Sequence, residues 1–117
     1  MNEQELLEKY AAKTVGFRPN TFIPLLKKIF VHRDASGNRY ELILTEVEES
    51  KLNKDIFDEF TLIFTSARHV SFPQGYFLLE HESLGEFPLL LVPTLSRNQE
   101  RNTYCVYFSY RKEEVCD

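Results

Sequence analysis

The sequence lacks tryptophan, and its 117 residues include only four glycines, two cysteines and three histidines. Because the glycines stand singly, the chain has no glycine-rich loop of the kind that holds a phosphate group. Cys105 and Cys116 fit no CxxC or Cys/His spacing, which argues against a zinc site, and we interpret both as reduced thiols. No GxSxG pattern provides a nucleophile elbow. We therefore expect a protein that is not an enzyme and that carries no metal or other cofactor.

Positive charge is also scarce, since 14 basic residues stand against 18 acidic ones and the net charge is −4. Proteins that bind nucleic acid usually carry a basic surplus that neutralises phosphates, so we predict no nucleic-acid partner. One local exception stays open, in which basic and aromatic side chains near the C-terminus form a face for RNA or another anionic partner. Its members would be Arg97, Arg101, Arg111, Tyr104, Tyr107 and Tyr110.

Long hydrophobic runs are missing as well. No apolar stretch approaches the roughly 18 residues that a membrane-spanning helix needs, so we predict no membrane association. Residues 1–5 have neither the basic nor the apolar region of a signal peptide. We therefore expect a soluble protein that resides in the cytoplasm or in a phage or similar particle.

Aromatic residues, in contrast, are abundant, with ten phenylalanines and six tyrosines. Phe and Tyr favour half-buried strands, and a hydrophobic content of 43% is typical of a globular domain. The length is that of one domain. We divide the chain into an N-terminal helix at 1–15, a β domain at 16–112 and a charged tail at 113–117.

Residues 2–13 predict a short helix with a narrow apolar stripe. The stripe consists of Leu6, Leu7 and Tyr10. Because a helix of this length is marginal in water, it must pack against something to persist. These three residues are therefore candidates for an interaction surface, and we favour packing on the helix's own β domain over packing on a partner. Residues 17–26 are predicted to be a connector that pins aromatic side chains.

Alternating hydrophobic residues predict six antiparallel strands joined by turns and polar loops. The predicted strands are 29–32, 40–47, 60–65, 76–81, 86–92 and 104–110, and the longer loops are 48–58, 66–75 and 96–102. An open meander of six strands would leave exposed edges. We therefore predict a small mainly β fold, an antiparallel meander closed as a barrel or a two-sheet sandwich, with one N-terminal helix.

The same alternation predicts which side chains face the core. Phe60, Leu62 and Phe64 should lie together on the buried face of their strand. In the preceding predicted strand, alternation places Val47 on the face opposite Leu44.

Several residues of the later strands have a structural interpretation. Gly85 should supply the positive φ of a hairpin turn, and Pro88, which cannot donate to a ladder, should lie at an edge or a bulge. Glu80 and His81 could form an acid–base pair, but neighbouring strand residues point to opposite faces. We therefore interpret both as fixing the hairpin, with His81 bonded to a backbone group. The amide of Gln74 is interpreted as tying the preceding loop to a neighbouring strand.

An acidic band follows the second predicted strand, and we interpret it as a solvated loop. It consists of Glu46, Glu48, Glu49, Asp55, Asp58 and Glu59. Calcium binding is the alternative, although the spacing fits no DxDxDG loop.

One long stretch carries a family resemblance. It runs Phe60-Thr61-Leu62-Ile63-Phe64, Phe72-Pro73-Gln74-Gly75, Leu79-Glu80-His81, Leu84-Gly85 and Leu89-Leu90-Leu91-Val92-Pro93. This pattern resembles the DUF6916 type, a family of small bacterial domains of unknown function. We take as its structural-motif positions Gln74, Gly75, Glu80, His81, Leu84, Gly85 and Pro93. The resemblance implies a shared fold. Because members of the family are often encoded near phage-tail-collar-like proteins, it also implies a structural or assembly role.

Two hypotheses of function follow. The leading one is a non-enzymatic structural or protein-interaction module, associated with a phage-tail-like or other assembly, that docks on another protein or on a second copy. The alternative is a small β-barrel that binds an apolar or aromatic ligand between its aromatic strands. The N-terminal helix exceeds the usual extent of the family, which leaves room for an added interaction surface.

Overall fold

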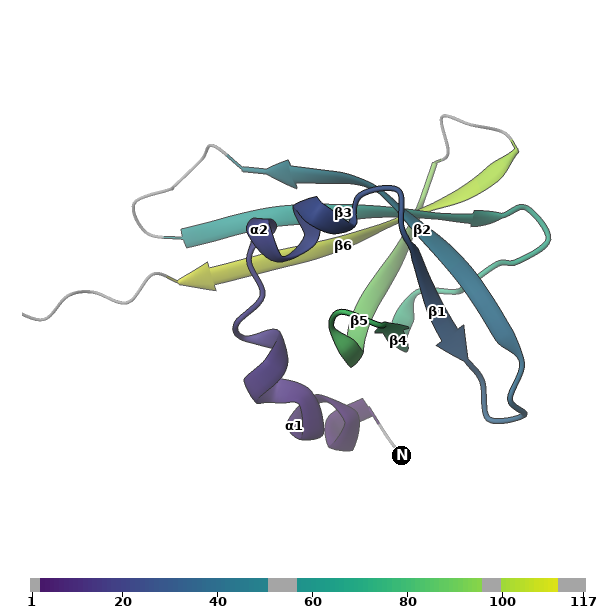
Figure 1. Ribbon diagram of the computed structural model, residues 1–117, viewed down its shortest axis with the longest axis horizontal. Helices are drawn as coiled ribbons and strands as arrows, with labels where there is room; N and C mark the ends of the chain where they lie inside the picture. The colour runs from purple at the N-terminus through teal and green to yellow at the C-terminus, as the bar shows by residue number, and fades with distance from the viewer. Residues whose placement is uncertain (1–2, 51–56, 96–99, 112–117) are drawn as a thin grey trace, which may run out of the picture.

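The computed structural model describes residues 3–50, 57–95 and 100–111, which form a mainly β fold (Figure 1). The strands are β1 (Ile29–Arg33), β2 (Arg39–Glu49), β3 (Phe57–Ala67), β4 (Gly75–His81), β5 (Gly85–Thr94) and β6 (Arg101–Arg111). The helices are α1 (Glu3–Thr14), α2 (Pro19–Phe22) and the 3-10 turn η1 (Ile23–Leu25). The predicted tail at 113–117, together with Asp55, Arg97 and Cys116, lies outside the described residues.

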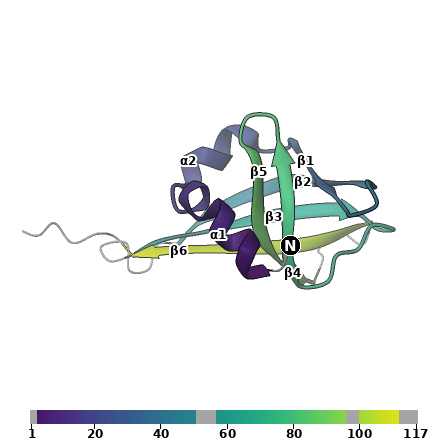
Figure 2. The same cartoon turned by 90° about the horizontal axis from the view of Figure 1, so that it is seen from below.

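The six strands are antiparallel and close into a barrel in the order β1-β2-β3-β6-β5-β4. The predicted closure is therefore confirmed as a barrel. The strand order is not sequential, because β6 pairs with β3 along its whole length and the β4–β5 hairpin lies between β6 and β1. Figure 2 shows this hairpin standing across the long strands β3 and β6.

The core lies inside the barrel, where the alternating residues of its strands meet. Phe60, Leu62 and Phe64 are buried together on β3, as predicted. The ring of Phe60 stacks on Phe108 of β6 with centroids 4.6 Å apart. Their neighbours include Leu79, Leu89, Leu91 and Val106, all buried, and the partly buried Phe77. Each such side chain contributes about 1.5–3 kcal/mol by leaving water.

The predicted side of Val47 is wrong, because β2 contains a bulge. Leu44 pairs with Phe64 and Glu46 with Ile63, so Thr45 is an extra residue on β2. The Thr45 hydroxyl donates a hydrogen bond to the carbonyl of Ile63 at 3.0 Å. An extra residue shifts the two-residue alternation by one, and Val47 therefore packs against the same core as Leu44.

The strands also run further than the sequence predicted. Residues 48–49 and 57–58 belong to β2 and β3, although 48–58 was predicted to be a loop. Residues 101–102 likewise begin β6 instead of ending a polar loop. Each extension has a partner in the neighbouring strand, as where Glu49 pairs with Phe60. Backbone hydrogen bonding to the neighbouring strand decides where each strand ends. Polar side chains on the solvent-facing side of a sheet are compatible with this pairing.

The barrel wall has an opening between β6 and the first part of β5. Among the described residues, β5 pairs with β6 only at 92–94, so the first part of β5 has β4 as its one strand neighbour. Pro88 lies in that part, which fits the predicted edge position. The connector fills the opening, because Phe17 and Phe22 are buried there and the Phe17 ring lies 5.2 Å from Phe87.

Helix α1 lies beside the same opening, and hydrogen bonds hold its C-terminal end there. The Lys13 ammonium donates to the backbone carbonyl of Glu86 at 2.9 Å, and the Tyr110 hydroxyl donates to the carbonyl of Thr14. The helix therefore packs on β5 and β6 of its own barrel, which is the arrangement we favoured from the sequence.

Candidate functional site

An open groove of about 840 Å³ lies between α1, the beginning of β1 and the tip of the β4–β5 hairpin. Three segments that are far apart in the sequence supply its walls. Helix α1 contributes Tyr10 and Lys13, the stretch from Lys27 through β1 to Arg39 at the start of β2 contributes six residues, and the β4–β5 hairpin contributes five residues between Glu80 and Glu86. The barrel closure brings these segments together, since β1 and β4 are neighbours.

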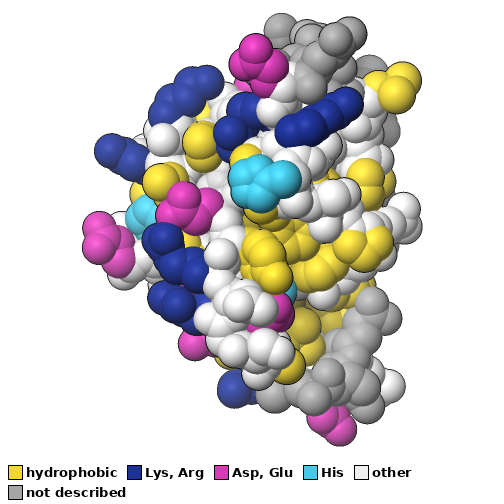
Figure 3. Space-filling view, turned by 90° about the vertical axis from the view of Figure 1, so that its right-hand side faces the viewer, with side chains coloured by type: hydrophobic (Ala, Val, Ile, Leu, Met, Phe, Trp, Pro, Cys, Tyr) yellow, Lys and Arg dark blue, Asp and Glu magenta, His cyan; other side chains and the backbone are white. Residues whose placement is uncertain are grey.

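Cations outnumber anions in this groove. Its basic residues are Lys13, Lys27, Lys28, Arg33 and Arg39, and its acidic residues are Glu80, Glu82 and Glu86. The groove is therefore positive, although the whole chain carries a net charge of −4. Figure 3 views the molecule from the side of the β1–β2 turn and shows Lys and Arg side chains along its left border, with acidic side chains among them.

The arginines and the lysines of the groove differ in their partners. Arg33 Nε donates to Glu80 Oε1 at 2.9 Å, and Arg39 pairs with Glu41. Within the described part of the chain, no carboxylate forms an ion pair with Lys27 or Lys28. The groove thus presents two consecutive lysines whose ammonium groups have no charged partner among the described residues.

Lys27 has an unusual backbone conformation. Its φ is +68°, and it is the one non-glycine residue with a positive φ in the described part of the chain. Its N–H donates to the Leu44 carbonyl at 2.7 Å, and the Lys28 N–H donates to the Leu25 carbonyl at 3.0 Å. A lysine in this region costs about 1–2 kcal/mol relative to its usual conformation, and a glycine would avoid that cost. Such strained residues often belong to functional sites.

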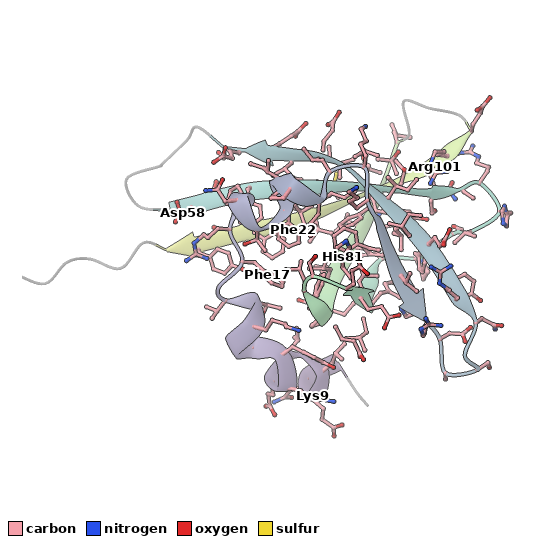
Figure 4. All side chains as sticks on the ribbon, viewed as in Figure 1. Lys9, Phe17, Phe22, Asp58, His81 and Arg101 are labelled. Carbon is pink, nitrogen blue, oxygen red and sulfur yellow. The ribbon has the colours of Figure 1, made fainter. Side chains whose placement is uncertain are left out.

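The hairpin side of the groove contains Glu80 and His81. Glu80 is held by Arg33, and the Ser83 N–H donates to His81 Nδ1 at 3.0 Å. Because Nδ1 accepts this bond, the neutral ring of His81 carries its proton on Nε2. The His81 ring packs 5.0 Å from Phe30, where the barrel opens toward α1 (Figure 4). Both residues line the groove, and each bonds to a different partner.

Gly85 and Leu84 shape the tip of the hairpin. Gly85 has a φ of +73°, the conformation that the turn prediction requires. A Cβ atom there would lie 2.9 Å from Lys13 Nζ, so the glycine leaves room for the lysine ammonium beside the turn. Leu84 is partly buried against the core. The hairpin can therefore bond to α1 at Glu86.

Apolar surface is exposed beside the lysines. Ile29, the first residue of β1, is 46% exposed and lines the groove. Of the predicted helix stripe, Leu6 and Tyr10 are partly buried, whereas Leu7 is 38% exposed. Tyr10 is the one stripe residue in the groove wall, where its hydroxyl lies 3.5 Å from a Glu86 carboxylate oxygen.

The remaining motif residues lie away from this groove. Gln74 is exposed, and its amide forms no hydrogen bond with the described residues, in contrast to the predicted tie. Tyr104 holds that loop instead, since its hydroxyl accepts the Phe72 N–H at 3.0 Å. Gly75 begins β4, and the exposed Pro93 lies near the end of β5.

The described members of the predicted basic-aromatic face do not share one side of the barrel. Tyr104 is buried in the barrel, whereas Tyr107 is 66% exposed on the outer side of β6. Tyr110 lies under the Arg18 guanidinium, 4.5 Å from the ring centroid, and Arg101 donates to Thr65. Alternation along the strand separates these rings onto opposite faces.

The acidic band is part of two strands, and its described members form no metal cluster. No group of three or more His, Cys, Asp or Glu side chains in the described ranges could hold a metal ion. Cys105 is a free, partly buried thiol on β6. Its hydrogen bond with Tyr107 raises the pKa of that tyrosine.

The inward-facing aromatic rings, which the ligand hypothesis would use, contact one another. Phe30 and Phe64 meet edge to face at 5.2 Å, and Phe60 stacks on Phe108. The apolar-ligand hypothesis stays a prediction.

Lys27, Lys28 and Ile29 were not predicted to be site residues from the sequence. Their signal was a pair of lysines directly before a strand, which by itself is typical of many solvated strand ends. The positive φ and the proximity of the hairpin depend on tertiary pairing, so sequence alone could not reveal them.

These features define a small closed antiparallel β-barrel with a charged groove walled by its N-terminal helix. The chain belongs to the DUF6916 family, described as a domain of unknown function, because that family model matches residues 17–108. The resemblance seen in the sequence is thereby confirmed, and α1 lies outside the matched region. Comparisons with curated proteins and with solved structures each returned no match. Within the described residues, no helix is both long and apolar enough to span a membrane.

Proposed function

We propose that this protein is a non-enzymatic protein-interaction module that binds another protein through the groove beside α1. The observation that carries the proposal is the pair Lys27 and Lys28, two ammonium groups without a charged partner among the described residues, next to the exposed Ile29. Protein interfaces commonly combine an apolar anchor with charges that select and orient the partner.

The backbone of Lys27 supports this proposal independently. A glycine would adopt the φ of +68° without strain, so the fold alone does not favour a lysine at this position. A side chain kept at a strained position is better explained by a contact it makes with a partner. The contact between the Lys27 side chain and the partner would then offset the backbone strain of this residue in the free protein.

Three titratable groups of the groove, those of Arg33, Glu80 and His81, support a role without catalysis. Arg33 and Glu80 form an ion pair, and His81 Nδ1 accepts a backbone hydrogen bond. The ion pair links β1 to the hairpin, and the His81 hydrogen bond lies within the hairpin turn. A general base needs an accessible lone pair, and the Nδ1 lone pair is already used.

The setting of the interaction is also a proposal. We place the protein in the cytoplasm or in a particle, and the phage-tail-like assembly suggested by the family resemblance stays a prediction. Tyr10 and Lys13 of α1 lie outside the family match, whereas the other residues of the groove lie within it.

Affinity capture from an extract of the native host tests the proposal, with two exposed isoleucines as a matched pair. Ile29 is 46% exposed inside the groove, and Ile23 is 44% exposed on η1, outside it. Wild type and Ile23→Asp should capture the same protein, and Ile29→Asp should lose it while keeping a normal melting temperature. Equal capture by both variants, or no captured protein at all, would contradict the proposal.

A further inference from the structure

Building on the proposed function, we propose that the partner segment bound in the groove is acidic, with carboxylates on Lys27 and Lys28 and an apolar side chain on Ile29. These three residues are consecutive, and all line the groove. The two lysines lie in the short connection between η1, which ends at Leu25, and β1, which begins at Ile29. A segment lying here meets charge and apolar surface within a few residues of its length.

The charge distribution of the chain favours an acidic partner at this place. The whole chain is negative, with a net charge of −4, and it repels an acidic segment elsewhere. The groove has the opposite sign, with five basic residues against three acidic ones. An acidic segment is therefore steered to the groove and kept in one orientation by it.

A peptide fits the groove better than a continuous polyanion such as RNA. Glu82 and Glu86 lie on the hairpin wall and would repel a polyanion, which carries a phosphate at every position, whereas the carboxylates of a peptide can be confined to the side of Lys27 and Lys28. A peptide has backbone N–H groups that can donate hydrogen bonds to these carboxylates. It also has apolar side chains that can cover Ile29. His81 adds an Nε2–H donor on the same wall. A mixed set of donors, acceptors and apolar surface is typical of peptide recognition.

Selection from a library of random short peptides tests the inference, using immobilised full-length protein. Peptides selected on wild type should be enriched in Asp and Glu around an apolar residue. In fluorescence anisotropy, the selected peptides should bind the double variant Lys27→Glu/Lys28→Glu about tenfold or more weakly, since two ion pairs become repulsions. Added salt should weaken binding to wild type.

Two further variants control this measurement. Arg68→Glu/Ser71→Asp/Gln74→Glu makes the same change in net charge at three exposed residues outside the groove lining. This control should bind the selected peptides as wild type does. Lys27→Gly should keep at least the wild-type melting temperature, because glycine suits the positive φ, and should bind severalfold more weakly. A melting curve of each variant shows that it folds.

The outcomes separate the inference from the proposed function. The inference is wrong if the selected peptides are neutral or basic, if none is enriched, if the double lysine variant binds them equally, or if single-stranded RNA displaces them. When Ile29→Asp also loses the captured host protein while the lysine variant retains it, the proposed function stands and the acidic partner is refuted. When capture itself fails, the proposed function is the part that is wrong.

Discussion

Removal of the Tyr104 hydroxyl should destabilise the fold by about 2 kcal/mol, although the aromatic ring stays in place. The Tyr104 side chain is 1% exposed, and its oxygen accepts the Phe72 N–H at 3.0 Å. The same oxygen lies 3.1 Å from Ser66 Oγ. Tyr104→Phe leaves a buried N–H group without its acceptor, and such an orphan costs about 1–3 kcal/mol.

The hydroxyl of Ser66 limits the loss, and this sets the expected magnitude. Ser66 also donates to the Val70 carbonyl at 2.7 Å, so the serine keeps one bond when the tyrosine oxygen is removed. The unsatisfied group is then chiefly the Phe72 N–H. We therefore expect a loss of unfolding free energy near the middle of the range of about 1–3 kcal/mol. Urea unfolding followed by circular dichroism measures the difference, and an unchanged slope m shows that stability alone has altered.

Tyr107→Phe is the matched control, because Tyr107 lies on the same strand and is 66% exposed. Its loss of a hydroxyl should change the free energy of unfolding by no more than about 0.5 kcal/mol. If Tyr104→Phe is no more destabilising than Tyr107→Phe, the hydroxyl does not hold the 67–72 loop and the reasoning is refuted.

Three further predictions concern the core, a turn and the helix. Phe64→Ala should cost about 3–5 kcal/mol in urea unfolding because it leaves a cavity at a fully buried site, and a loss below 1 kcal/mol would contradict the core assignment. Hydrogen bonds from Asn38 lower the pKa of Asp34 below its ordinary 3.8, so the stability they contribute is present above pH 3.8 and is lost as the pH falls through the folded-state pKa. NMR titration of the carboxyl carbon should show this low pKa, and Asn38→Ala should raise it; an unchanged pKa would disprove that cause. Deletion of residues 1–15 should lower the melting temperature, because the bonds from α1 to Glu86 and Tyr110 are lost, whereas an unchanged melting curve would show the helix to be dispensable.

Alternation predicted the core strands well where one face of a strand is buried along its whole length. Phe60, Leu62 and Phe64 meet that condition, because β6 pairs with β3 throughout. The prediction failed at Val47, since no residue near Thr45 marks a bulge in the sequence. It also could not give the strand order, because pairing of β3 with β6 depends on contacts some 40 residues apart.

The candidate site was less predictable than the fold. Glu80 and His81 were identified from the hairpin motif, and the Ser83 contact gives His81 a backbone bond of the kind the sequence suggested. Lys27 and Lys28 belong to the site because Lys27 has a positive φ and because residues 80–86 of the hairpin, far along the chain, lie across the groove from both lysines. Neither is a local property of the sequence, so the groove could be identified only from the closed barrel of the structure.

The central claim is that the groove beside α1 contacts another protein, and a photo-cross-linking residue at position 29 tests it most directly. The same residue at position 23, equally exposed but outside the groove, is the reference. In cells of the native host, the account predicts a discrete protein adduct from position 29 that disappears with Lys27→Glu/Lys28→Glu and is missing from position 23. No protein adduct at position 29, or equal adducts from both positions, would contradict it.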